Sequence, residues 1–97
     1  MTNSSQPQYI LRLYITGATH HSMLAVKNIK FICEKYLSGD YSLEIIDVYQ
    51  KLDTAMSEDI IAAPTLIKFS PEPVRKLIGD LSNTNKVLAA LGLRETP

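Results

Sequence analysis

The 97-residue sequence has a single cysteine, no tryptophan and no net charge. One cysteine excludes an intramolecular disulfide framework and a cysteine-based metal cluster. Ten basic and ten acidic side chains cancel, which argues against a general attraction to nucleic acid or to an anionic membrane. No apolar run is long enough to span a membrane, and the start of the chain lacks the basic and apolar segments of a secretory signal. We therefore expect a cytoplasmic protein.

Glycine is also scarce, and its four copies stand alone in the sequence. Neither a phosphate-binding P-loop nor a dinucleotide-binding motif can be written from isolated glycines. The carboxylates do not occur at a spacing that would pair them for acid and base catalysis. The sequence therefore contains no motif of a nucleotide hydrolase or of a carboxylate-dependent enzyme, and no cofactor is predicted.

The hydrophobic content of 45% predicts one small α/β domain over residues 9–93, with a flexible leader at 1–8 and a short tail at 94–97. Periodicity predicts a strand at 9–15, a helix at about 22–37 and a second strand at 43–48, parallel to the first and buried on both faces at Ile45 and Ile46. A shorter helix is expected at 51–62. An antiparallel hairpin of strands 65–69 and 74–78 follows, and Ser82 is the expected cap of a final helix that ends near Gly92.

The joint between Ala63 and Pro64 organises this pattern. Proline lacks an N–H and disfavours helix in the residue before it, so Pro64 should end the helical stretch and begin the strand that follows. A βαβ start, a strand that begins at a proline, a hairpin and a final helix are typical of a thioredoxin-like domain. Such a domain carries its two cysteines at the start of the first helix, where this chain has Thr-His-His-Ser at 19–22.

The residues that could carry thiol or metal chemistry are few. Cys33 lies about three turns inside the predicted helix, where a buried structural thiol is the first interpretation and a redox-sensitive thiol the second. His20 and His21 are adjacent and would point in different directions, so they are expected to be exposed loop residues rather than metal ligands. More promising are Lys68, Arg75 and Lys76, which are predicted to cluster around the hairpin and form an interaction surface, the alternative being a solvated hairpin.

Four blocks of sequence identify a resemblance: YILRLYITG at 9–17, IDV at 46–48, APTL at 63–66 and PVRKLIGDLS at 73–82. Together they resemble the KaiB family over about residues 9–93. The resemblance implies a non-enzymatic regulator that binds a KaiC-like hexameric ATPase and alters its phosphorylation or ATPase cycle. It also implies a metamorphic protein, which rests as a dimer or tetramer in a fold peculiar to the family and binds the ring as a thioredoxin-like monomer.

Some residues follow the family and others depart from it. Lys68 and Arg75 match basic positions on the family's partner-facing surface, which includes the contact with KaiA. Leu24 replaces a common arginine, and Ala-Thr-His-His at 18–21 replaces Asn-Thr-Pro-Asn, so a KaiA-like partner is doubtful. Where the family commonly has Gly-Leu-Asp, this chain has Ala90, Leu91 and Gly92. Because alanine favours a helix and Gly92 can end it, Ala90 and Gly92 are predicted to favour the thioredoxin-like state. Together with Pro64 they are the expected fold-switch residues.

The leading hypothesis is thus a KaiB-like regulator of a KaiC-type ATPase in circadian or stress-related signalling. The alternative from another class is a thioredoxin- or glutaredoxin-like redox or glutathione-binding protein, which the proline joint permits and the missing cysteine opposes. A purely structural oligomer is the third hypothesis, and it predicts a fixed tetramer that ignores any ATPase.

Overall fold

The computed structural model describes residues 7–48 and 64–93. Its elements follow the order β1 (Tyr9–Ile15), α1 (His20–Tyr36), β2 (Tyr41–Asp47), β3 (Thr65–Ser70), β4 (Arg75–Ile78) and α3 (Thr84–Ala90). Six of the seven predicted elements are therefore present, with ends that shift by a few residues. The helix predicted at 51–62 lies outside the described residues.

The strands form one sheet in the order β2-β1-β3-β4. β1 and β2 are parallel, as the sequence predicted, and they pair along the whole of β1. β3 lies antiparallel to β1 on its other side, and β4 returns antiparallel to β3. This βαβ unit followed by a hairpin and a helix is a thioredoxin-like arrangement, so the predicted fold class is confirmed.

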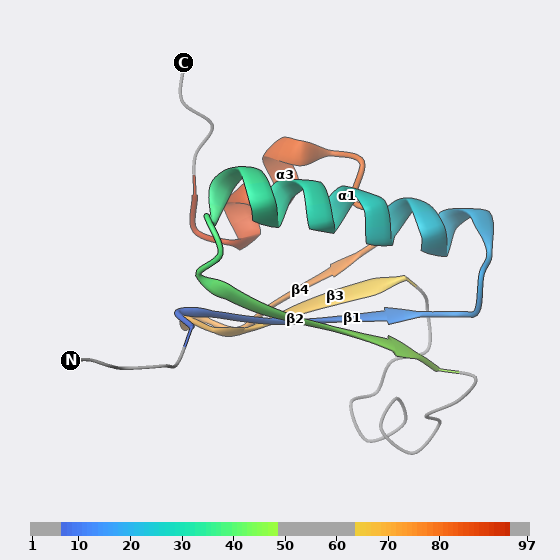
Figure 1. Ribbon diagram of the computed structural model, residues 1–97, viewed down its shortest axis with the longest axis horizontal. Coiled ribbons are helices and arrows are strands. Elements are labelled where there is room, and N and C mark those ends of the chain that lie inside the picture. The colour runs from blue at the N-terminus through green and yellow to red at the C-terminus, as the bar shows by residue number, and fades with distance from the viewer. Residues whose placement is uncertain (1–6, 49–63, 94–97) are drawn as a thin grey trace.

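Both described helices cover the same face of the sheet (Figure 1). The main core lies between them and the strands, and it is built from alternate residues of β1 together with the buried face of each helix, including Leu11, Leu13, Ile29, Val87 and Leu88. On the opposite face of the sheet, Tyr14, Ile46 and Ile67 form a second, smaller apolar cluster. Successive side chains of a strand point to opposite faces of the sheet. The odd-numbered residues of β1 therefore enter the main core, and Tyr14 enters the smaller cluster.

The prediction that Ile45 and Ile46 are both buried is wrong for Ile45. Ile46 is 6% exposed, whereas Ile45 is 36% exposed. The reason is the position of β2 at the edge of the sheet that the described residues form, where its one neighbour is β1. A run of two β-branched residues predicts a strand, but the depth of each side chain depends on the order of strands in the sheet.

Both described helices begin at a residue whose side chain caps the first turn. Thr19 caps α1, and its side-chain oxygen accepts a hydrogen bond from the Ser22 backbone N–H at 3.2 Å. The expected cap of the last helix, Ser82, is wrong: Asn83 caps α3 and accepts from the Lys86 N–H at 3.2 Å. Ser82 instead donates its own N–H to the side chain of Asp80, and therefore belongs to the preceding turn.

The predicted stop at Gly92 is confirmed. Gly92 has a φ of +80°, and its N–H bonds the Ala89 carbonyl at 3.1 Å, while the Leu93 N–H reaches back to the Leu88 carbonyl at 2.8 Å. This pair of bonds is a Schellman motif, which satisfies carbonyls at the end of the helix and requires the left-handed conformation that glycine adopts without strain. None of the helices in the described ranges has both the length and the apolar character needed to cross a membrane.

Candidate functional site

The start of α1 is the position at which a thioredoxin carries its reactive cysteines. Here Thr19 acts as the helix cap, and the fully buried Ser22 uses its hydroxyl oxygen to accept a hydrogen bond from the Thr16 N–H at 3.1 Å. The two hydroxyl side chains therefore join the β1–α1 loop to the helix. The side chains at this position stabilise the loop and the first turn of the helix, and none of residues 19–22 is a cysteine.

Cys33 lies in the second half of α1 and is completely buried. Burial, together with the smaller effect of the negative charge of Glu34, raises the pKa of its thiol to about 12. Since the thiolate is the reactive form of cysteine, a thiol with this pKa is a poor nucleophile at neutral pH. Of the two interpretations of Cys33, the structure favours the buried structural thiol.

His20 and His21 are exposed at the first turn of α1, and their ring centroids lie 6.0 Å apart. His21 has Asp80 as a neighbour, with 3.9 Å between Nδ1 and Oδ2. Within residues 7–48 and 64–93, no three histidine, cysteine or acidic side chains are placed to hold a metal ion. His21 therefore takes part in a polar contact between two parts of the fold.

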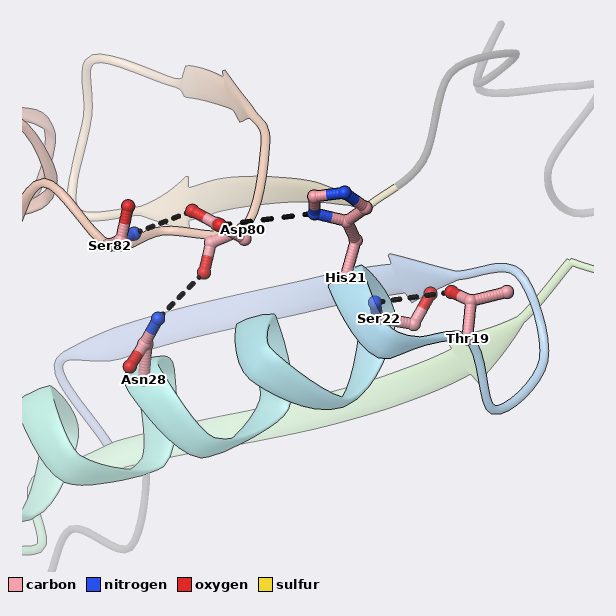
Figure 2. Close-up of polar contacts among 6 residues, drawn as sticks. All are labelled: Thr19, His21, Ser22, Asn28, Asp80 and Ser82. Carbon is pink, nitrogen blue, oxygen red and sulfur yellow. Dashed lines mark hydrogen bonds and ion pairs between the residues drawn. The ribbon is translucent and has the colours of Figure 1, made fainter.

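That contact belongs to a larger connection between α1 and the β4–α3 turn, shown in Figure 2. Asn28 on α1 donates a hydrogen bond from Nδ2 to the Asp80 carbonyl at 2.9 Å. The Asp80 carboxylate accepts the Ser82 N–H at 3.0 Å, and hydrogen bonds from Ser82 lower the pKa of Asp80 together with the nearby His21. Leu81 adopts a φ of +64° in this turn and is buried. The turn is thus fixed by polar contacts on one side and by an apolar anchor on the other.

We call residues 79–82 with Asn28 and His21 the α1–turn contact. Neither Asp80 nor Asn28 is predicted as a site residue from the sequence, because 52 residues separate the two partners. The GDLS block at 79–82 belongs to the PVRKLIGDLS segment that resembles the KaiB family. A signal was present in the acidic residue two positions before a serine, which is typical of a turn closed by the acidic side chain.

The three basic residues predicted to cluster at the hairpin are divided by the sheet. Lys68 pairs with Arg75 across β3 and β4, and Lys76 pairs with Ile67. Ile67 belongs to the cluster on the face without described helices, and Leu66 belongs to the main core. Alternation therefore places Lys68 and Arg75 on the helix-covered face and Lys76 on the opposite face.

Their exposure also differs. Lys68 is only 3% exposed, while Arg75 and Lys76 are exposed to solvent. Burial lowers the pKa of Lys68, and the charge of Arg75 lowers it further. Lys68 and Arg75 are therefore cross-strand neighbours on one face, whereas Lys76 lies on the other face; of the three, Arg75 and Lys76 offer their charges on the surface of this state.

A pocket of about 130 Å³ lies beside the hairpin, between the end of β4 and the start of α3. Leu77, Leu81 and Val87 provide apolar walls, and Lys86 lies at the same pocket. Pro64 is buried at the start of β3, where its carbonyl accepts the Gly79 N–H at 2.9 Å. The proline, the pocket and the α1–turn contact therefore surround the same end of β4.

The fold and the start of α1 define a thioredoxin-like domain without the cysteine pair of a thioredoxin. A sequence model of the KaiB domain matches residues 12–93. The chain therefore belongs to the KaiB family of circadian clock proteins, as the four sequence blocks indicated.

Relatives support this assignment. The circadian clock oscillator protein KaiB of Gloeothece citriformis is 45% identical over 91 residues, which cover 94% of this chain and 86% of that protein. The circadian clock protein KaiB3 of Synechocystis is 48% identical over 84 residues, covering 87% and 82%.

Solved structures agree on the fold. The N-terminal domain of SasA from Synechococcus elongatus superimposes with a TM-score of 0.73 at 23% identity, covering 100% of this chain and 94% of that one. Mitochondrial thioredoxin 3 from Saccharomyces cerevisiae gives 0.72 at 17% identity, covering 91% and 81%. At these identities the likeness concerns the fold alone.

Proposed function

We propose that this protein is a non-enzymatic adaptor that docks on a KaiC-type hexameric ATPase and modulates its phosphorylation or ATPase cycle in circadian or stress-related signalling. It acts in the cytoplasm. The observation that carries the proposal is a KaiB-family chain folded as a thioredoxin-like domain in which Thr19 and Ser22 fill the redox positions with hydrogen-bonding side chains. Such a chain keeps the backbone arrangement of a thioredoxin without the cysteine pair on which its electron transfer depends.

The thioredoxin-like arrangement described above is the state that we propose to bind the ATPase. In a second state the protein rests as a dimer or tetramer with a different fold of its second half. Pro64, Ala90 and Gly92 influence the balance, since Pro64 starts β3, Ala90 lies in the last turn of α3, and Gly92 ends that helix. Two packings that interconvert can differ by only about a few kcal/mol.

Arg75 and Lys76 are proposed to make the direct electrostatic contacts with acidic groups of the ATPase. Lys68 supports them from beneath the surface as the cross-strand neighbour of Arg75. A contact with a KaiA-like protein is not part of the proposal, because Leu24 and the loop at 18–21 depart from the family residues.

Native mass spectrometry tests the proposal directly. The protein is measured alone and after long incubation with a KaiC-type hexamer and nucleotide. A tetramer that slowly gives way to ring-bound monomers is the expected result. A tetramer that remains unchanged beside the ring contradicts the proposal and favours a purely structural oligomer.

Charge reversal tests the contact residues. Replacing both Arg75 and Lys76 by Glu should weaken binding to the ring and reduce its dependence on salt, since exposed charges act through a screened Coulomb interaction. The matched control replaces Lys27 and Lys30, which are exposed on α1, by Glu and makes the same change in net charge. Equal affinities for the two double variants would remove Arg75 and Lys76 from the interface.

The rival redox function has its own assay. A thiol–disulfide turnover measurement with the wild-type protein should give no activity above background, because Cys33 is buried and has no partner cysteine. Turnover that disappears in a Cys33→Ser variant would overturn the non-enzymatic proposal.

A further inference from the structure

Within residues 7–48 and 64–93, no strand pairs with the outer edge of β4. β4 is the last strand of the sheet formed by the described residues, and the Gly79 N–H bonds the Pro64 carbonyl of the neighbouring strand. In an antiparallel pair the backbone groups of successive residues point alternately toward and away from the partner strand. Gly79, Leu77 and Arg75 therefore face β3, and Lys76 and Ile78 direct their N–H and C=O groups outward.

The side chains along this edge are unusually accessible for a strand. Ile78 is 64% exposed, and Val74, immediately before the strand, is 56% exposed. Lys76 and Ile78 pair with Ile67 and Thr65, and they share the face of the sheet that has no described helix. Arg75 is exposed on the other face. The edge thus combines two outward backbone positions with apolar and positively charged side chains.

We propose that β4 is a docking strand, to which an extended acidic segment of the partner protein adds as a further strand of the sheet. This inference rests on the proposed function, in which the partner is the ATPase ring. Strand addition supplies main-chain hydrogen bonds for affinity and alternate side chains for specificity. The segment carries a carboxylate opposite Lys76, an apolar side chain against Ile78 on the same face, and a second carboxylate within reach of Arg75.

Charge decides between this occupant and a second copy of the same chain. Two copies of β4 paired antiparallel would bring two Arg75 and two Lys76 side chains into one short ribbon. Like charges on neighbouring strands are destabilising, and a short edge that carries lysine resists self-association. An acidic segment neutralises the same charges.

A proline substitution separates the backbone contribution from the charge. Lys76→Pro removes an outward N–H without removing a bond to β3, and Lys76→Ala removes the charge while keeping that N–H. For binding to a KaiC-type hexamer, we expect Lys76→Pro to weaken affinity at least tenfold and Lys76→Ala only a few-fold. Circular dichroism of both variants checks that the fold is retained.

Amide hydrogen exchange in the wild-type complex gives a second test that requires no variant. The amides of Lys76 and Ile78 should slow at least tenfold on binding, whereas those of Arg75 and Leu77, which already bond β3, should change little. Binding of the ring with no slowing at Lys76 and Ile78 overturns the docking strand and leaves the proposed function intact. Failure of the wild-type protein to bind the ring overturns both. A dimer of the protein alone in which the amides of Lys76 and Ile78 are slowed and which Lys76→Pro abolishes assigns the edge to a second copy, which also overturns the proposal.

Discussion

The two halves of this molecule differ in the length and pairing of their elements. The first half joins β1, the 17-residue α1 and β2, which pairs with β1 along its whole length. The second half contains the four-residue β4 and the seven-residue α3. It is held in place by β3, by the apolar side of α3 and by the α1–turn contact. Short elements that depend on a few anchors can be released at low cost, so the second half is the part in which a second fold is expected.

The largest expected effect comes from truncating a buried apolar side chain in the second half. Leu88→Ala, at a position 1% exposed in α3, should destabilise the thioredoxin-like state by about 2–5 kcal/mol through lost burial and the cavity that remains. Amide exchange should accelerate in β4 and α3 and remain slow in β1, α1 and β2.

The matched variant in the first half is Ile29→Ala, which truncates a completely buried side chain of α1. It should accelerate exchange throughout the described residues, because both halves pack on α1. Equal patterns for Leu88→Ala and Ile29→Ala would show that the halves do not open separately.

A smaller effect is expected from the stop of α3. Gly92→Ala forces a residue with a side chain into a φ of +80°, where a Cβ meets no other atom within 4 Å, so the cost comes from backbone strain alone. About 1–2 kcal/mol should be lost from the thioredoxin-like state. Denaturant unfolding measures this loss, and Gly39→Ala, at a φ of +83° in the first half, provides the comparison. Of these two variants, only Gly92→Ala should raise the fraction of protein in the proposed tetrameric resting state.

Within α3 itself, Ala90→Gly should cost about 1 kcal/mol through lower helix propensity. That amount corresponds to about a fivefold change in the ratio of two states, so the tetramer share in a native mass spectrum should rise. An unchanged spectrum would remove Ala90 from the residues that set the balance between the folds.

Loss of one hydrogen bond between the halves should have a similar or smaller effect. Asn28→Ala removes the bond to the Asp80 carbonyl and should lower stability by about 0.5–1.5 kcal/mol, measured by urea unfolding. Lys27→Ala, at the exposed neighbouring position, should be nearly neutral. Equal losses in the two variants would indicate a general effect on α1 rather than a contact between the halves.

The smallest expected effect is a change in how the stability of the protein depends on pH. The pKa of Asp80 is lowered in the folded protein by hydrogen bonds from Ser82 and by His21. Its contribution to stability is therefore present above the unfolded value of about 4 and is lost as the pH falls toward the folded value. Asp80→Asn should remove that part of the pH dependence, which thermal unfolding between pH 3 and 6 can follow. Parallel curves for the two proteins would contradict the assignment.

Much of the fold could be predicted from local features. The alternation along residues 9–15, the helical spacing from Ala25 to Ile32 and the break at Pro64 each reflect a period or a backbone restriction that acts over a few residues. The cap at Ser82 was predicted wrongly because three consecutive residues, Ser82, Asn83 and Thr84, can all accept an N–H. Only the turn held by Asp80 decides which of them begins the helix.

The candidate site was less predictable, since its parts come from distant positions. The sequence predicts that Lys68, Arg75 and Lys76 lie in one hairpin. The exposure of each side chain, however, depends on which face of the sheet the helices cover. Asn28 and Asp80 meet only because α1 lies beside the β4–α3 turn. No local pattern contains that information.

The missing cysteine pair and the local elements both follow from features of the amino-acid sequence that act over a few residues. A chain with one cysteine cannot supply a pair, and glycine at position 92 can end a helix wherever that helix lies. The burial of Lys68, the exposure of Ile45 and the edge position of β4 among the described strands come from the packing of the sheet. These properties depend on neighbours from other parts of the chain, and burial and pairing are set by the packing of the whole sheet rather than by the residues themselves.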